Sequence, residues 1–243
     1  MDDRALQDDL IRYLSDARLR AVPPESPKLT HDEAGKAQKF ARFLARRYYR
    51  DRLIRSFRYS RLFSAGAGRK AEEICDSEAF EPFLDQCVLG SVDSARRASE
   101  MAVAHLAPGQ RLFPWWSSLI EYESAHLLQT ATTERAQPGQ HYQRAASATC
   151  KRFDWALPEM LPRLRRGETA GEEFRRSATL LFSRTHIGKI YVVELDKRTE
   201  EVFSAVDGSR TAKQIAESAG ITLQQAEEIL NNLAQIGAVE KPV

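Results

Sequence analysis

The feature that most constrains the fold is the pattern of the last part of the chain, Ala178 to Val243. Two short runs of apolar, β-branched or aromatic residues, at 179–182 and 189–195, are typical of strands, and Gly188 supplies a flexible turn between them. Three short helical patterns follow, and their apolar positions recur at helical spacing. We therefore expect a small domain that combines a hairpin with three helices.

Capping residues mark where these helices begin and end. Thr199 is the expected cap of the first helix, and Thr211 and Thr222 each open a capping box, because a glutamine follows three residues later. Gly237 lies where the last helix is expected to stop, and residues 238–240 are expected to add a last short strand. The order strand, turn, strand, helix, helix, turn, helix is a winged-helix pattern.

A winged helix can read DNA or capture a peptide, and the last helix helps to separate the two uses. A DNA-reading helix presents basic or amide side chains to base edges. Residues 223–235 contain Gln and Asn amides, but they also include Glu227 and Glu228 and contain no Lys or Arg. Carboxylates beside a polyanion lose the phosphate attraction that supplies much of DNA affinity. Peptide capture is therefore the preferred hypothesis, and a winged-helix transcription regulator that binds DNA is the alternative.

In peptide capture, an extended peptide pairs with the exposed edge of a sheet while its side chains enter the groove beside the last helix. The run 190–195 is apolar on both faces, as this use requires, although two core faces would give the same pattern. The candidate peptide-binding residues are Lys189, Ile190, Tyr191, Val192, Val193 and Glu194 on the strand, and Leu223, Glu227, Leu230, Asn231 and Ala234 on the helix.

Several short segments of this region carry a family resemblance. Leu195-Asp196, the run from Val206 to Thr211, Ile215-Ala216 and Leu233 to Gly237 resemble the pattern of PqqD-type domains. Domains of this family are recognition elements that bind the leaders of ribosomally synthesised and post-translationally modified peptides (RiPPs). The resemblance implies a PqqD-like winged-helix domain that binds a leader peptide.

The composition bounds the class of the protein. The 243 residues suffice for one large or two modest domains, and a net charge of +2 with 42% hydrophobic residues is ordinary for a soluble chain with a real core. No apolar run approaches the length of a membrane span and no apolar signal core follows Met1, so we expect a cytoplasmic protein. Cys75, Cys87 and Cys150 are odd in number and widely spaced, which argues against a disulfide framework.

The first part of the chain is expected to be helical, with a first helix at residues 3–20 and its most basic part between Lys36 and Phe63. Ten Lys and Arg residues alternate there with aromatic and aliphatic residues, without glycine or proline, which predicts one long helix or a helix pair. The basic face could bind an acidic partner or nucleic acid. In the other interpretation, the arginines are solvated and the aromatics are core. Arg46 and Arg50 are candidate partner-docking residues.

An apolar helix is predicted from Phe113 to about Ala131, with its Trp, Leu and Ile positions mostly in the core. Glu123 and His126 share a face of it, which is half of a carboxylate-bridged di-iron site, but no second Glu-x-x-His occurs. We therefore expect no metal in this chain. A free-standing helical metalloenzyme that uses these two residues stays a further alternative, and the roles of His126 and the three cysteines stay open.

The same helix carries a second resemblance. Phe113-Pro114, Leu119 and Tyr122 to Ala125 resemble a stretch in MbnC-like partner proteins, which work with multinuclear non-haem iron oxidative enzymes; residues 153–167 resemble the connector that follows. Glu123 matches the glutamate of the family, whereas Ser124 departs from its usual tryptophan and His126 has no clear counterpart. The resemblance implies a heterodimer with an iron enzyme, and we name as further docking candidates Trp115, Trp116 and Glu123.

Together these patterns predict a mostly α protein, with a helical partner-docking domain at 1–170 and a small α+β winged-helix domain at 171–243. The resemblance implies a non-catalytic subunit that binds the leader of a precursor peptide. It would present the cysteine-containing core to a partner non-haem iron enzyme, as in 3-thiaglutamate-like RiPP biosynthesis. The iron is expected in the partner and no cofactor in this chain; neither a membrane nor nucleic acid is an expected partner.

Overall fold

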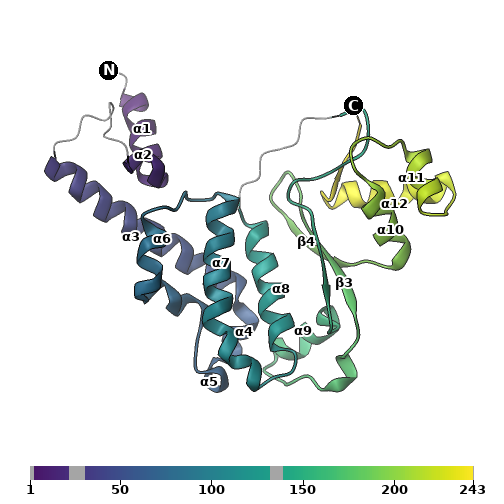
Figure 1. Ribbon diagram of the computed structural model, residues 1–243, viewed down its shortest axis with the longest axis horizontal. Helices are drawn as coiled ribbons and strands as arrows, with labels where there is room; N and C mark the ends of the chain where they lie inside the picture. The colour runs from purple at the N-terminus through teal and green to yellow at the C-terminus, as the bar shows by residue number, and fades with distance from the viewer. Residues whose placement is uncertain (1–2, 22–30, 132–138, 243) are drawn as a thin grey trace. The chain divides into compact units, whose positions relative to one another are not determined.

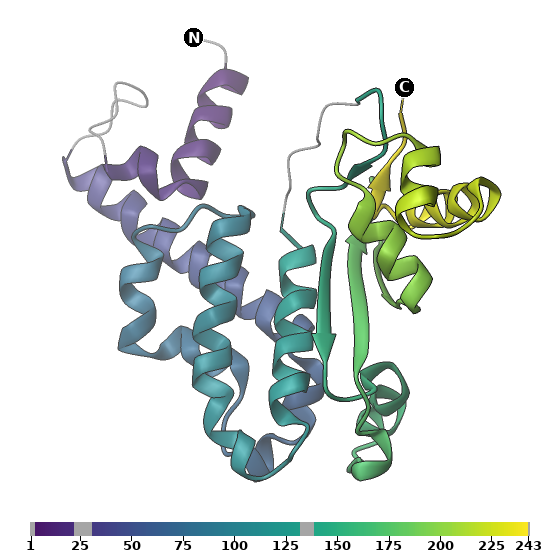
Figure 2. The same cartoon turned by 45° about the vertical axis from the view of Figure 1, so that its right-hand side comes forward.

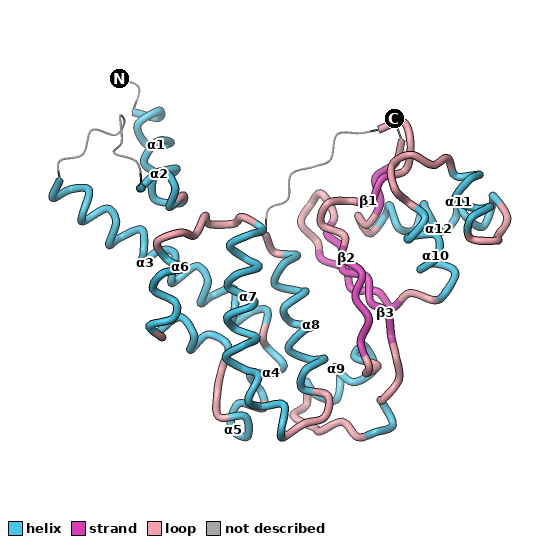
Figure 3. The backbone as a smooth tube through the Cα atoms, in the orientation of Figure 1, coloured by secondary structure: helices cyan, strands magenta, loops and turns pink. Residues whose placement is uncertain are grey.

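The structure, a computed structural model, describes residues 3–21, 31–131 and 139–242 (Figure 1). The chain forms two compact units, Met1–Ala131 and Thr132–Val243. The structure is mostly helical, as predicted, and every strand within the described residues lies in the second unit (Figure 3). None of the described helices is both long enough and apolar enough to cross a membrane.

The first unit is built from helices and short 3-10 turns. Helices α7 (Val92–Leu106) and α8 (Trp116–Gln129) lie side by side in both views of the ribbon (Figures 1 and 2). The other elements are α1 (Asp3–Ser15), α2 (Ala17–Ala21), α3 (His31–Ser56), α4 (Arg58–Leu62), α5 (Ser64–Ala67) and α6 (Glu81–Leu84), with 3-10 turns η1 (Ala71–Asp76), η2 (Glu78–Phe80) and η3 (Ala107–Arg111).

Helix α3 buries one stripe of residues spaced four apart. Ala41, Ala45, Tyr49 and Leu53 are almost inaccessible to solvent, because this spacing places them on one helix face. The Tyr49 ring meets the ring of Phe83 edge to face, with ring centroids 5.0 Å apart. Of the two arrangements predicted for this segment, one long helix or a helix pair, the structure has the pair, since α4 follows α3 almost directly.

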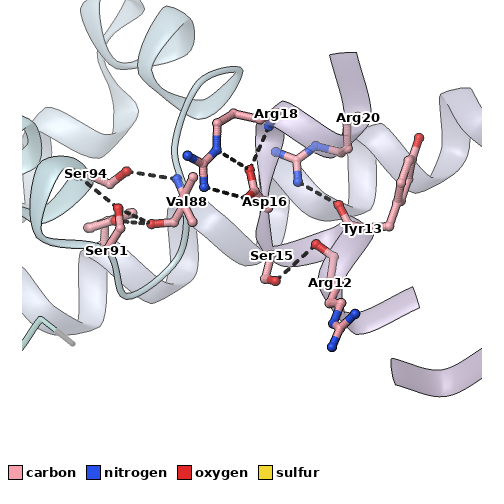
Figure 4. Close-up of polar contacts among 10 residues, drawn as sticks. Arg12, Tyr13, Ser15, Asp16, Arg18, Arg20, Val88, Ser91 and Ser94 are labelled. Carbon is pink, nitrogen blue, oxygen red and sulfur yellow. Dashed lines mark hydrogen bonds and ion pairs between the residues drawn. The ribbon is translucent and has the colours of Figure 1, made fainter. Parts of the chain in front are cut away.

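The single helix predicted at residues 3–20 is interrupted at Asp16, which separates α1 from α2. The Asp16 carboxylate accepts the N–H of Arg18 at 2.8 Å and also pairs with its guanidinium (Figure 4). Asp16 forms an isolated antiparallel bridge with Val88, whose N–H is held by the Ser94 hydroxyl at 2.8 Å. An aspartate that competes for backbone donors favours such a break, and the apolar periodicity alone did not reveal it.

The second unit contains two small antiparallel sheets. The larger has the strand order β2 (Thr149–Phe153), β3 (Ala178–Arg184), β4 (Ile190–Glu194), and the smaller pairs β1 (Gln143–Arg144) with β5 (Val239–Glu240). Around them lie the helices α9 (Leu157–Arg165), α10 (Lys197–Ala205), α11 (Ala212–Ser218) and α12 (Leu223–Gln235), and the 3-10 turn η4 (Glu172–Phe174).

Capping determines where the last three helices begin. The capping boxes of Thr211 and Thr222 are both present, as predicted. The prediction that Thr199 caps α10 is wrong: the cap is Asp196, whose carboxylate accepts the N–H of Thr199 at 2.7 Å. Aspartate is a stronger cap than threonine, and its position three residues earlier adds a turn to the helix.

The second unit begins earlier than the boundary predicted at residue 170. Strand β2 supplies one edge of the main sheet, and the Arg144 guanidinium donates to the carbonyl oxygen of Phe203 at 3.1 Å, at the end of α10. The sequence did not indicate β2, because the strand has only five residues and carries Lys151 and Arg152 in its middle. Long-range pairing, rather than local composition, makes this segment part of the unit.

Gly237 and Gly220 provide a matched test of how α12 is held. Both have a positive φ, but a Cβ on Gly237 would lie 2.6 Å from the Arg184 carbonyl oxygen, whereas nothing lies within 4 Å of one on Gly220. We expect Gly237→Ala to lower the free energy of unfolding more than Gly220→Ala, by about 1–3 kcal/mol, because only the first adds a backbone clash to the strain of φ. Urea denaturation followed by circular dichroism measures both; equal losses would contradict the close packing.

Candidate functional site

The first candidate site is the outer edge of β4. Among the strands that the structure describes, β4 pairs only with β3. The N–H of Leu195 donates to the carbonyl of Thr179 at 2.9 Å, and the N–H of Thr185 to that of Lys189 at 2.9 Å, so these are hydrogen-bonded pairs. Such pairs alternate along an antiparallel ladder. The residues of β4 whose backbone groups point away from β3 are therefore Ile190, Val192 and Glu194.

The side chains of β4 alternate between two faces of the sheet. Val193 lies opposite Leu181, and Tyr191 lies opposite Ser183. Leu181 belongs to the core that the helices share, and the Ser183 hydroxyl donates to the Ile236 carbonyl at 2.8 Å. Since opposite residues share a face, Tyr191 and Val193 are on the helix-covered side. Val193 is nevertheless 37% exposed, which places it at the open flank of that side.

The two ends of the strand are fixed by charged contacts. The Lys189 ammonium lies 4.6 Å from the centre of the Tyr191 ring. The Glu194 carboxylate accepts from Arg176 at 2.5 Å, and Arg176 also binds Glu159. These hydrogen bonds to Glu194 and Glu159 raise the pKa of Arg176. The Glu194 side chain is thus held within the unit, whereas the residues between these ends offer an apolar edge.

The predicted residues of α12 do not form one accessible surface. Leu223 is 43% exposed and Glu227 is exposed, whereas Asn231 and Ala234 are half-buried. Leu230 is fully buried in the core of the unit, so the prediction that it contacts a peptide is not carried into the site. The apolar periodicity of this region places Leu230 on the inward face of the helix, and the core of the unit occupies that face.

The tryptophans predicted to dock a partner lie in the interior of the first unit. Trp115 and Trp116 are at most 1% exposed and pack with the rings of Phe63 and Phe113. The Trp116 Nε1–H donates to the Leu106 carbonyl at 2.9 Å, which satisfies its polar atom inside the core. Buried rings have no surface to offer a partner, so the docking surface proposed below leaves them out.

The arginines predicted to dock a partner bind carboxylates of their own unit. Arg46 pairs with Glu81, and Arg50 pairs with Asp76. Arg42 also binds Glu81, and this attraction, chiefly from Arg46, lowers the pKa of Glu81. The pairing joins α3 to segments more than twenty residues away, so the spacing of the arginines alone could not reveal it. Exposed pairs of this kind contribute about 1 kcal/mol or less each.

Glu123 has a structural role at the start of α4. Its carboxylate accepts the N–H of Tyr59 at 2.6 Å and that of Ser60 at 3.3 Å, while the residue before α4, Phe57, has no capping side chain. The first N–H groups of a helix need such acceptors, and the helix dipole favours a negative charge there. Glu123 is 0% exposed, so it is a buried cap rather than a docking residue.

The electrostatics of Glu123 reflect two opposed effects. Burial raises its pKa to about 8, while the hydrogen bonds from Ser60 and Tyr59 act in the other direction. His126, one turn further along α8, has a pKa lowered by burial and then by the charge of Arg58. Its Nδ1 is buried without a hydrogen-bond partner among the described residues. The pair shares a face, as predicted, but both Glu123 oxygens are occupied by backbone donors.

Phe40 and Phe43 on α3 were expected to be core in one interpretation of the sequence, and they are exposed instead. Phe40 is 52% and Phe43 57% exposed. The signal that could have placed them is the spacing of Ala41, Ala45 and Tyr49, because a buried stripe at these positions turns Phe40 and Phe43 toward solvent.

Comparisons with known proteins identify no relative: no protein-family model matches the chain, and no curated protein matches it. Within the described residues, no group of three or more His, Cys, Asp and Glu side chains is arranged to hold a metal ion. The three cysteines are free thiols, of which Cys75 and Cys87 are buried and Cys150 is exposed.

The cap formed by Glu123 predicts a pH-dependent stability. The folded pKa of about 8 exceeds the ordinary value of 4.5, so the folded chain holds a proton that the unfolded chain releases between these values. The contribution of Glu123 to the free energy of unfolding is fully present below pH 4.5 and is lost as the pH rises through about 8. Glutamine keeps the carbonyl acceptor and does not titrate. Between about pH 5 and 9, the wild-type Tm should therefore fall more than that of Glu123→Gln, by the equivalent of roughly 4 kcal/mol at most.

Thermal denaturation across this pH range measures the difference. Parallel Tm curves for the two proteins would mean that the buried carboxyl is not the titrating group. The exposed Glu100→Gln variant on α7 is the matched control for the loss of one carboxyl elsewhere in the first unit.

Proposed function

We propose that the second unit is a PqqD-like winged-helix domain that binds the leader of a ribosomal precursor peptide by adding a strand to β4. The observation that carries the proposal is the apolar outer edge of β4, along which the backbone groups of Ile190, Val192 and Glu194 point outward. An exposed sheet edge is a template for another extended chain. The small antiparallel sheet followed by three capped helices supports this assignment.

The two edges of the main sheet differ in the way that the proposal requires. The opposite edge, β2, carries Lys151 and Arg152 in its middle, and charged residues on an edge discourage pairing with another chain. β4 has four successive apolar residues, Ile190 to Val193, between its charged ends. A peptide therefore has a reason to choose β4.

Backbone and side-chain contacts contribute differently to the free energy of binding a peptide at β4. Three outward residues offer six backbone groups, and each hydrogen bond contributes a net ~1 kcal/mol. Ordering the backbone of an added strand costs about 1–2 kcal/mol per residue, which offsets most of that gain. Net affinity then depends on apolar contacts beside Tyr191 and Val193, on the side of the sheet that the helices cover. The leader should therefore place an apolar residue there.

In this proposal the chain is a non-catalytic subunit of a heterodimer. The helical first unit docks on a partner non-haem iron enzyme, and the bound leader delivers the cysteine-containing core peptide to that enzyme, as in 3-thiaglutamate-like biosynthesis. Tethering raises the effective concentration of the core without a catalytic residue in this chain. Co-expression with the proteins encoded beside it, followed by mass spectrometry and metal analysis, tests the assembly. An iron protein that co-purifies one to one supports it; stoichiometric iron in the isolated chain contradicts it.

Val192→Pro should abolish most leader binding. Proline removes the outward N–H of Val192 but no donor of the β3–β4 ladder, so the sheet should stay folded while the added strand loses a central hydrogen bond. We expect the affinity for a fluorescein-labelled precursor peptide, measured by fluorescence anisotropy, to fall about tenfold or more. Val192→Ala keeps the N–H and should lose less.

Arg152→Pro is the matched control on the opposite edge. Residues of β3 that face β4 alternate with those that face β2, so the register places the backbone groups of Arg152 on the outer side of β2. Arg152→Pro removes an outward backbone N–H, as Val192→Pro does, but at the edge where no peptide is proposed to bind. Its affinity for the leader should therefore match that of the wild type. If Arg152→Pro weakened binding as much as Val192→Pro, the peptide would not be adding to β4. Duplex DNA that binds better than the peptide would favour the regulator.

A further inference from the structure

We propose that a surface on α3, formed by Lys39, Phe40, Phe43 and Arg47, docks an acidic amphipathic helix of the partner enzyme. This surface, the Phe40–Phe43 surface, replaces the buried residues that the sequence suggested for docking. The inference rests on the proposed function, because it names the surface by which the first unit would hold that partner.

The geometry of α3 presents these residues together. Its buried stripe, Ala41 to Leu53 at every fourth position, faces the interior of the unit. Phe40, Phe43 and Arg47 follow at spacings of three and four on another face of the same helix. The rings of Phe40 and Phe43 stack, with centroids 6.4 Å apart and planes inclined by 21°. All four residues of the surface lie within little more than two helical turns.

Two half-exposed phenylalanines carry a free-energy cost that a partner would remove. Full burial of one such side chain stabilises by about 1.5–3 kcal/mol relative to exposure, and both rings are more than half exposed. Their mutual stacking already restricts both side chains, so docking would lose less rotamer entropy than with two independent rings. Aromatic side chains in this arrangement are typical anchors of protein interfaces.

The charge beside the rings specifies an acidic occupant. Several arginines of the basic stretch are paired internally: Arg42 binds Asp85 and Glu81, Arg50 binds Asp76, and Arg61 lies 3.4 Å from Glu72. Within the part of the chain that the structure describes, Lys39 and Arg47 form no ion pair, and both are exposed. They therefore offer positive charge to a carboxylate placed next to an apolar side chain.

Two other occupants fit the surface less well. A nucleic acid that binds through its backbone typically uses several phosphate contacts, about 6–10 for a strong binder, which is more than the exposed cations beside these rings, Lys36, Lys39 and Arg47, would supply. A second copy of the chain would bring identical surfaces together across a two-fold axis, and Lys39 and Arg47 would then face like charges.

The test uses the full chain and a defined probe. The probe is a fluorescein-labelled helical peptide of about 18 residues, long enough to hold a helix, with Leu and Phe on one face and Glu beside them. Fluorescence anisotropy should detect binding that weakens as salt is added. We expect the double variant Phe40→Ala with Phe43→Ala to lose about tenfold or more in affinity, and Arg47→Glu to lose affinity and most of the salt dependence.

The controls distinguish binding at this surface from non-specific binding elsewhere on the chain. Leu62→Ala removes a side chain on α4 that is 53% exposed and lies outside the surface, so it should bind the peptide as the wild type does. A peptide with Lys in place of Glu should bind at least about tenfold more weakly than the acidic one. Circular dichroism of the double variant should match the wild type, because both phenylalanines are exposed.

Several outcomes would overturn the inference. The acidic peptide could fail to bind, or bind the double variant unchanged. A single-stranded RNA oligonucleotide could bind more tightly than the peptide and compete with it. Sedimentation velocity could reveal a dimer that the double variant loses, which would assign the surface to a second copy.

Leader binding by the same proteins keeps this inference distinguishable from the proposed function. The double variant should bind the labelled precursor peptide normally, and Val192→Pro should bind the acidic peptide normally. If the wild type binds the acidic peptide and no precursor peptide, leader capture fails while the Phe40–Phe43 surface stands. If it binds only the precursor peptide, the surface fails while leader capture stands.

Discussion

The structure depends on one constraint: a backbone N–H or C=O group that leaves water must find another partner. Glu123 meets this requirement for the start of α4, where Phe57 cannot. Thr211 and Thr222 meet it for the last two helices. The outer edge of β4 is one of the places where backbone groups in regular structure stay open among the described residues, and this is why we propose it as the place for a peptide.

Folding changes the role of the basic residues in the first unit. Ten basic residues between Lys36 and Arg61 suggest a surface for a polyanion. In the folded first unit, carboxylates of η1, α6 and their neighbourhood bind several of those arginines, so the segment holds the unit together as well as charging it. The positive charge that remains for a partner is small and local, and it lies beside the rings of Phe40 and Phe43. In our proposal, such a surface would bind a protein segment rather than a long polymer of phosphates.

The two proposals divide the work between the two units. The edge of β4 would hold the leader through its backbone, and the Phe40–Phe43 surface would hold the enzyme through apolar and ionic contacts. These interactions respond differently to their surroundings: salt weakens contacts between exposed charges, whereas strand addition depends little on it. Binding of the peptide and binding of the enzyme can therefore be measured separately.

The sequence by itself determined the local elements. The capping boxes of Thr211 and Thr222, the hairpin around Gly188 and the long basic helix all follow from short-range patterns, because their causes lie within a few residues. Only the tertiary structure decided which faces are buried. Glu123 turned inward, Phe40 and Phe43 turned outward, and β2 joined the sheet from a segment that local composition left unassigned. Burial is a relation between distant parts of the chain, and a periodic pattern specifies that a helix has two faces without specifying which one the rest of the chain will cover.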